Sequence, residues 1–109
     1  SWKMVTIIEL IKEIEKYYPC DIVLTGGEPT LYYKTLYPIV EKFKNITIET
    51  NGTIEIDFKK YPKYKDVTFA MSIKLSNSGE KFEKRVNKKA IKKIAKNSKN
   101  SFFKFVIDS

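Results

Sequence analysis

A short apolar run that ends in two glycines, a carboxylate and a proline is the strongest constraint on the fold. Residues 22–29 read Ile-Val-Leu-Thr-Gly-Gly-Glu-Pro. Short β-branched runs bounded by glycine or proline are typical of buried strands. Adjacent glycines let the backbone turn tightly and approach a bound molecule. The stretch predicts a strand-end site where carbonyls and Glu28 hold a cationic group, or else an ordinary turn with a solvated Glu28.

Composition limits the chain to one domain or part of one. The chain has 109 residues, of which 42% are hydrophobic, and this fraction suits a packed core. No apolar run is long enough for a membrane span and no signal-peptide pattern opens the chain, so we expect a cytoplasmic protein with no membrane partner. The single cysteine, Cys20, excludes a disulfide framework and any multi-cysteine metal site built from this chain alone.

The net charge of +8 raises the question of a nucleic-acid partner. Clustered lysines attract phosphate, and most of the excess charge follows Phe58. However, Arg85 is the one arginine, and arginine is the usual residue for base and phosphate recognition. We therefore interpret the lysines as solvated helix faces and expect no direct nucleic-acid binding.

Hydrophobic periodicity predicts alternating helices and strands. A Thr6-x-x-Glu9 capping box opens the first helix, and Asn87 can cap the last one. The strong turn signal Asn51-Gly52 leaves open a hairpin whose second strand is residues 54–58. The predicted elements are a helix over 6–18, a strand from 22, a helix from about 35 to 43, a strand over 46–50, a surface connection over 59–66, a strand over 67–73, a helix after 87 and a strand over 102–107.

This order predicts an α/β fold with about four parallel strands and helices on one face. The chain begins with a helix that no strand precedes and ends on a strand that no helix follows. We therefore expect residues 1–109 to be one partial (βα) barrel domain, truncated at both ends.

Polar residues lie at the carboxyl ends of three of the predicted strands, at residues 25–28, 49–51 and 72–74. Ligands of parallel α/β folds bind at the carboxyl ends of the strands. Packing alone does not explain polar and charged residues at three successive strand ends. The sequence therefore predicts that these segments converge on one ligand site.

Four segments, in this order, resemble the radical S-adenosylmethionine superfamily. The Gly-Gly-Glu element is common to the superfamily, whereas the second and third segments are most similar to the 7-carboxy-7-deazaguanine synthase family. The resemblance covers most of the chain. The segments are Thr25-Gly-Gly-Glu-Pro29, Glu49-Thr-Asn-Gly-Thr53, Ser72-Ile-Lys-Leu-Ser-Asn-Ser-Gly79 and Lys104-Phe-Val-Ile-Asp108.

The resemblance implies a radical SAM partial TIM barrel whose 4Fe–4S cluster and S-adenosylmethionine generate a 5′-deoxyadenosyl radical. The implied reaction is that of a carbon–nitrogen lyase. It contracts 6-carboxy-5,6,7,8-tetrahydropterin to 7-carboxy-7-deazaguanine with loss of ammonia, assisted by Mg²⁺, in queuosine biosynthesis. The implied partners are this pterin substrate, an electron donor such as flavodoxin, and a second copy in a homodimer.

The resemblance also assigns cofactor-binding residues. Gly26, Gly27 and Glu28 correspond to positions that bind the methionine ammonium of S-adenosylmethionine, and carbonyls with a carboxylate are suitable acceptors for it. A second set lines the cofactor, and Ser72 hydrogen-bonds its carboxylate or ribose. This set is Ser72, Ile73 and Lys74, where Ile73 replaces the usual proline and Lys74 is alternatively a structural ion-pair partner.

Three further residues, Thr25, Glu49 and Asn51, are assigned to the substrate side of the site by the same resemblance. No residue of this chain is assigned to a metal. The three-cysteine cluster motif belongs before the first helix and is missing, and Cys20 is in the wrong place. The family's magnesium-binding threonine and substrate-binding arginine are missing as well. We therefore expect an active parent enzyme and an inactive 109-residue piece.

Two alternatives stay open. One is another radical S-adenosylmethionine branch, such as a glycyl-radical-activating enzyme, which the segment over residues 72–79 disfavours. The other is a basic RNA-binding α/β module, which the lysine content permits.

Overall fold

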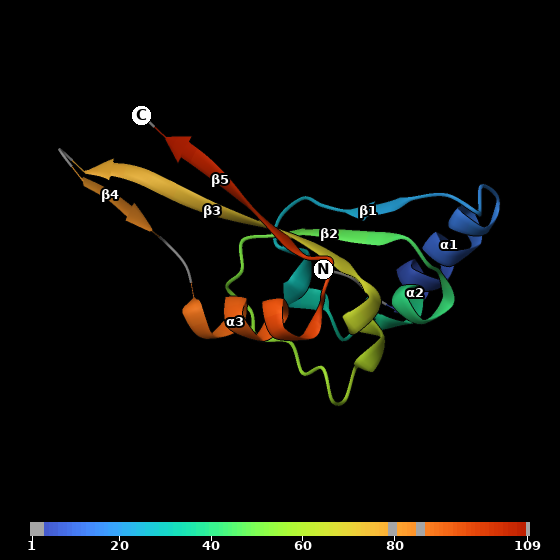
Figure 1. The fold of residues 1–109 in the computed structure, drawn as a ribbon. Helices are drawn as coiled ribbons and strands as arrows, with labels where there is room; N and C mark the ends of the chain where they lie inside the picture. The colour runs from blue at the N-terminus through green and yellow to red at the C-terminus, as the bar shows by residue number, and fades with distance from the viewer. Residues whose placement is uncertain (1–3, 79–80, 85–86, 109) are drawn as a thin grey trace.

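The computed structural model describes residues 4–78, 81–84 and 87–108, and Figure 1 shows its fold. Short helices alternate with strands, as the hydrophobic periodicity predicts. The elements are α1 (Met4–Glu15), β1 (Ile22–Leu24), the 3₁₀ helix η1 (Pro29–Tyr32), α2 (Tyr37–Lys42), β2 (Ile46–Thr50), the 3₁₀ helix η2 (Pro62–Asp66), β3 (Thr68–Ser78), β4 (Lys81–Lys84), α3 (Lys88–Asn97) and β5 (Phe102–Asp108).

Four strands of the described chain form a parallel sheet in the order β1-β2-β3-β5. Ile48 of β2 lies opposite Leu24 of β1 on one side and Phe69 of β3 on the other. Ala70 of β3 lies opposite Phe102 of β5. The predicted α/β class with four parallel strands is therefore confirmed.

The sheet has one covered face and one open face. Along β2, buried residues alternate with half-buried ones, which is the pattern of a strand packed on one side. The covered face contacts the apolar sides of all three α-helices, and Figure 1 shows α2 and α3 on the same side of the sheet. The core residues that join the covered face to the helices are Ile7, Ile22, Leu36, Ile39, Val40, Phe43, Ile46, Ile48, Phe69, Met71 and Ile94. Helices on one face are thus confirmed.

The third strand is longer than the sequence predicted. β2 ends where Thr50 pairs with Met71, but β3 continues to Ser78 and pairs with the antiparallel β4 from Leu75 onward. Figure 1 shows β3, β4 and β5 extending past the ends of β1 and β2. The prediction that residues 72–74 end a strand is therefore wrong, because backbone pairing with β5 continues through them.

Two other expectations fail. Thr6 does not open the first helix, because α1 already begins at Met4. Residues 54–58 form no strand, so the hairpin alternative after Asn51-Gly52 is wrong. The chain instead leaves β2 in an irregular segment that packs against α3. There Gly52 has a φ of +70°, which glycine adopts without strain.

The predicted surface connection over residues 59–66 contributes to the core. Tyr64, within η2, is fully buried, and its hydroxyl donates to the carbonyl of Tyr33. Burial raises the pKa of Tyr64, and the neighbouring Tyr37, Tyr33 and Tyr61 raise it further. The phenol is therefore neutral and acts as a hydrogen-bond donor inside an aromatic cluster.

We expect Gly52→Ala to destabilise the protein more than Gly26→Ala. Both glycines have positive φ, so each alanine adds backbone strain of about 1 kcal/mol. A Cβ on Gly52 would also lie 2.9 Å from Cγ1 of Ile91, whereas a Cβ on Gly26 would meet nothing within 4 Å. Urea unfolding should show an extra loss of about 1–3 kcal/mol for Gly52→Ala. Equal losses, or an extra loss that persists in an Ile91→Ala background, would contradict the steric explanation.

Candidate functional site

The turn after β1 forms an open backbone cradle. Gly26 has a φ of +84° and Gly27 a φ of +43°, so both adopt a conformation that side chains disfavour. A Cβ built on either glycine would meet no atom within 4 Å. Conformation, not crowding by the protein, therefore requires glycine here. The space above the turn is free for another molecule to approach the backbone.

The Glu28 carboxylate connects this turn to the end of β2. Its Oε2 accepts hydrogen bonds from Thr30 N at 3.2 Å, from Thr50 Oγ1 at 2.6 Å and from the Thr30 hydroxyl. Its Oε1 accepts from Asn51 N at 2.7 Å. We call this arrangement the Glu28 clamp. The alternative of a merely solvated Glu28 is therefore wrong.

Two buried threonines complete the clamp. Thr30 is 0% exposed and Thr50 is 3% exposed, so their hydroxyls need partners inside the protein. Thr50 Oγ1 donates to Glu28 and accepts from Gly52 N at 3.1 Å, which links the two glycine turns. Sequence reasoning missed both threonines. The available signal was Thr50 itself, a hydroxyl on the same face of β2 as the buried Ile46 and Ile48.

A second polar group lies on the open face of the sheet. Thr25 Oγ1 donates to Glu49 Oε1 at 3.1 Å, and Lys104 Nζ lies 3.8 Å from Glu49 Oε2. These residues come from the end of β1, from β2 and from β5. Thr25 and Glu49, which the sequence assigned separately to the substrate side, are therefore in direct contact. Lys104 was missed because only the sheet register shows that it shares this face.

The three residues predicted to line the cofactor divide between the two faces. Ile73 is 8% exposed and lies on the covered face. Its neighbours Ser72 and Lys74 alternate to the open face, where Ser72 lies opposite Lys104 in the register. The side chain of Ile73 thus points away from the predicted site, and only its backbone is placed to contribute there.

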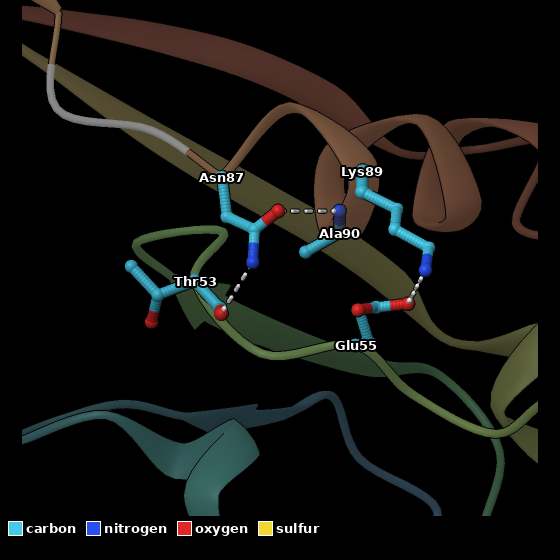
Figure 2. A network of polar contacts seen from close by, with 5 residues as sticks. All are labelled: Thr53, Glu55, Asn87, Lys89 and Ala90. Atoms are coloured by element: carbon cyan, nitrogen blue, oxygen red, sulfur yellow. Dashed lines mark hydrogen bonds and ion pairs between the residues drawn. The ribbon is translucent and has the colours of Figure 1, made fainter.

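The loop carrying Asn51 is held by its own side chains and by α3. Asn51 Oδ1 accepts from Thr53 N at 3.1 Å and from Thr53 Oγ1 at 2.5 Å. Asn87 Oδ1 accepts from Ala90 N at 3.1 Å, and Asn87 Nδ2 donates to the Thr53 carbonyl at 3.3 Å (Figure 2). The predicted Asn87 cap is confirmed, and the same side chain also fastens the loop to the helix.

An ion pair reinforces this attachment. Lys89 of α3 lies 3.8 Å from the carboxylate of Glu55, as Figure 2 also shows. The Lys89 side chain is 81% exposed, so the pair adds little stability by itself. The first turn of α3 therefore orients the loop chiefly through Asn87 and through the contact of Gly52 with Ile91.

The described residues provide no metal centre. No group of three or more histidine, cysteine, aspartate or glutamate side chains that could hold a metal lies within the described ranges. Cys20 is half-buried and free. One thiolate does not fit a 4Fe–4S cluster, which needs several. The cradle, in contrast, offers backbone acceptors beside a carboxylate, and these groups fit an ammonium ligand.

Fold and site together define an α/β protein whose parallel strands place a glycine cradle at the end of β1 and a charged pair on the open face of the sheet. In comparisons with known proteins, no family model and no solved structure matches the chain. The chain is 38% identical over 56 residues to the 7-carboxy-7-deazaguanine synthase of Hyperthermus butylicus. The match covers 48% of this chain and 24% of that enzyme. Among the described residues, no helix is long and apolar enough to cross a membrane.

We expect Thr50→Val to destabilise the protein by about 1–3 kcal/mol, because Glu28 loses a donor and Gly52 N loses its acceptor. Thr50→Ser keeps the hydroxyl and should restore most of the loss. Thermal and urea unfolding measure both variants. A loss of equal size in the two variants would show that the methyl group, not the clamp, is responsible.

We expect Asn87→Asp and Asn87→Ala to separate the two roles of this side chain. Replacement by alanine removes the helix cap and should lower the free energy of unfolding by about 1 kcal/mol, whereas aspartate retains a capping oxygen. Aspartate, however, places an acceptor against the Thr53 carbonyl. Amide hydrogen exchange in residues 51–53 should therefore accelerate in Asn87→Asp while global stability changes little. Unchanged exchange there would contradict the attachment of the loop by Asn87.

Proposed function

We propose that this chain is the cofactor-binding part of a radical S-adenosylmethionine enzyme that makes 7-carboxy-7-deazaguanine from 6-carboxy-5,6,7,8-tetrahydropterin. The partial match to a 7-carboxy-7-deazaguanine synthase supports this reaction. The single observation that carries the proposal is the open Gly26–Gly27 cradle beside a carboxylate, at the carboxyl end of a parallel strand. Ligands of parallel α/β folds bind at this end.

The cradle is suited to the methionine end of S-adenosylmethionine. Carbonyl oxygens of Gly26 and Gly27 would accept N–H bonds from the ammonium, and Glu28 would supply the negative charge. Glu28 already accepts four hydrogen bonds, so it would act on the ammonium mainly through its charge. Ser72 and Lys74, on the open face, would meet the cofactor's carboxylate or ribose. The bound cofactor supplies the radical chemistry.

The substrate side of the proposed site is the open face around Glu49. Thr25, Glu49 and Asn51 would meet the pterin, and the Thr25–Glu49 hydrogen bond of 3.1 Å orients the carboxylate. The cluster thiolates do not come from this chain, which has one cysteine. We propose that they, the Mg²⁺ ligands and the contacts with an electron donor and a homodimer partner lie in other parts of the enzyme.

Calorimetric titration with S-adenosylmethionine tests the proposal. We expect Glu28→Gln to weaken binding by about tenfold, or roughly 1.4 kcal/mol, because the ammonium loses the attraction of a nearby negative charge. Glu55→Gln removes the same charge from the loop that faces α3 and should leave affinity unchanged. Thr50→Val separates charge from position, since it disturbs the clamp but keeps the carboxylate.

If Glu28 acts by charge, Thr50→Val should lose less affinity than Glu28→Gln. Equal losses in the two variants would assign Glu28 to positioning the cradle. Wild-type affinity in Glu28→Gln would remove Glu28 from the site.

A further inference from the structure

We propose that Lys104 is a positioning residue for the substrate side of this site. Its ammonium holds the Glu49 carboxylate over the middle of the open sheet face. There Glu49 accepts N–H bonds from the amino-pyrimidinone edge of a flat heterocycle. This role rests on the proposed function, because the pterin substrate carries such an edge.

The sheet register places Lys104 on the same face as Glu49. Glu49 lies opposite Ala70, and Ala70 lies opposite Phe102. Lys104 follows Phe102 by two residues, so it projects from the same side of the sheet. Thr25 follows Leu24, which pairs with Ile48, and it therefore lies beside Glu49. One polar row thus crosses from β1 to β5 on the face that no α-helix of the described residues covers.

The Glu49–Lys104 pair crosses an intervening strand. β3 lies between β2 and β5, so the two backbones are about 9.6 Å apart, or two strand spacings. Glu49 and Lys104 have long enough side chains to span this distance, and their charged atoms approach to 3.8 Å. The residues of β3 beneath them are Ala70 and Ser72, opposite Glu49 and Lys104 respectively. Small side chains at these two positions leave room for the pair above the sheet.

The pair has spare hydrogen-bonding capacity. A separation of 3.8 Å is an ion-pair distance and is longer than a hydrogen bond. Glu49 Oε1 accepts from Thr25, while Oε2 faces the ammonium. Both side chains are close to half exposed, at 43% for Glu49 and 44% for Lys104. A ligand lying on this face can therefore reach the remaining lone pairs of the carboxylate.

Stability alone is a weak reason for this arrangement. An exposed ion pair contributes about 0–1 kcal/mol, and salt screens it. Apolar exposed residues flank the pair on the outer strands, namely Val23 on β1 and Phe102 and Val106 on β5, whereas Thr47, Thr68 and Lys74 lie on the same face of β2 and β3. A flat ring can stack on the apolar residues of an outer strand while its edge donates to the Glu49 carboxylate. The charge pair therefore fits ligand recognition better than it fits stabilisation.

The test compares Lys104→Met with Lys104→Arg, using 6-carboxypterin as a fluorescent probe. Methionine keeps an unbranched apolar stem without the charge, and arginine keeps the charge. We expect Lys104→Met to raise the Kd for the probe by about fivefold to tenfold, or roughly 1–1.4 kcal/mol. Lys104→Arg should stay close to wild type. Lys99→Met removes a lysine before β5 as a matched control and should leave the Kd for the probe unchanged. The affinity for S-adenosylmethionine should be the same in wild type and in all three variants.

Two further probes identify the contact. Replacing the 2-amino group by a carbonyl, as in 6-carboxylumazine, removes an N–H donor, so wild type should prefer 6-carboxypterin and Lys104→Met should lose that preference. Unsubstituted pterin lacks the carboxylate and should show the same Lys104→Met penalty. A penalty confined to carboxylated probes would mean that Lys104 binds that group directly and would overturn the positioning role.

The remaining outcomes separate this role from the proposed function. Unchanged probe affinity in Lys104→Met overturns the role of Lys104 and leaves the proposed function standing. Wild-type protein that binds S-adenosylmethionine but not the pterins overturns this inference and the substrate side of the proposed function, and leaves the cofactor cradle standing. Wild-type protein that binds neither overturns the proposed function and the role of Lys104 with it.

Discussion

The Glu28 carboxylate is the interaction on which the arrangement of this rim depends. It accepts hydrogen bonds from two threonine hydroxyls and from two backbone amides, one in η1 and one directly after β2. Because Thr30 and Thr50 are buried, no water replaces the carboxylate if it moves away. The Gly26–Gly27 cradle is therefore set at a fixed distance from the end of β2. One side chain thus combines a structural connection with the negative charge that a cationic ligand needs.

The open face depends on a different physical property, the two-residue alternation of side chains along a strand. Alternation sends Ile48 and Met71 to the helices and leaves Glu49, Ser72 and Lys104 on the opposite side. The same alternation places the side chain of Ile73 on the covered face and those of Ser72 and Lys74 on the open face. The polar residues of the proposed substrate side therefore share a face because the register is fixed by the apolar core behind them.

Periodicity in the sequence was sufficient for the fold class, because runs such as residues 46–50 and 102–107 have the length and composition of buried parallel strands. It could not show where β3 ends, because the polar residues Ser76 and Ser78 are still part of the strand. Ser76 pairs with both β4 and β5, and Ser78 pairs with β4. The expectation that strand ends converge brought the segments of Thr25 and Glu49 together but did not specify their hydrogen bond. It could not show the Glu28 clamp or the position of Lys104, since both depend on how neighbouring strands are placed against one another.

The fifth strand has a consequence for the behaviour of the protein in solution. β5 pairs with β3 along one edge, and Phe102, Phe103, Phe105, Val106 and Ile107 are all at least 45% exposed, on both faces of the strand. A strand of this kind is a template for edge-to-edge association. A higher protein concentration should therefore favour association through this strand. Electrostatic repulsion between chains of net charge +8 opposes that association, and added salt screens this repulsion.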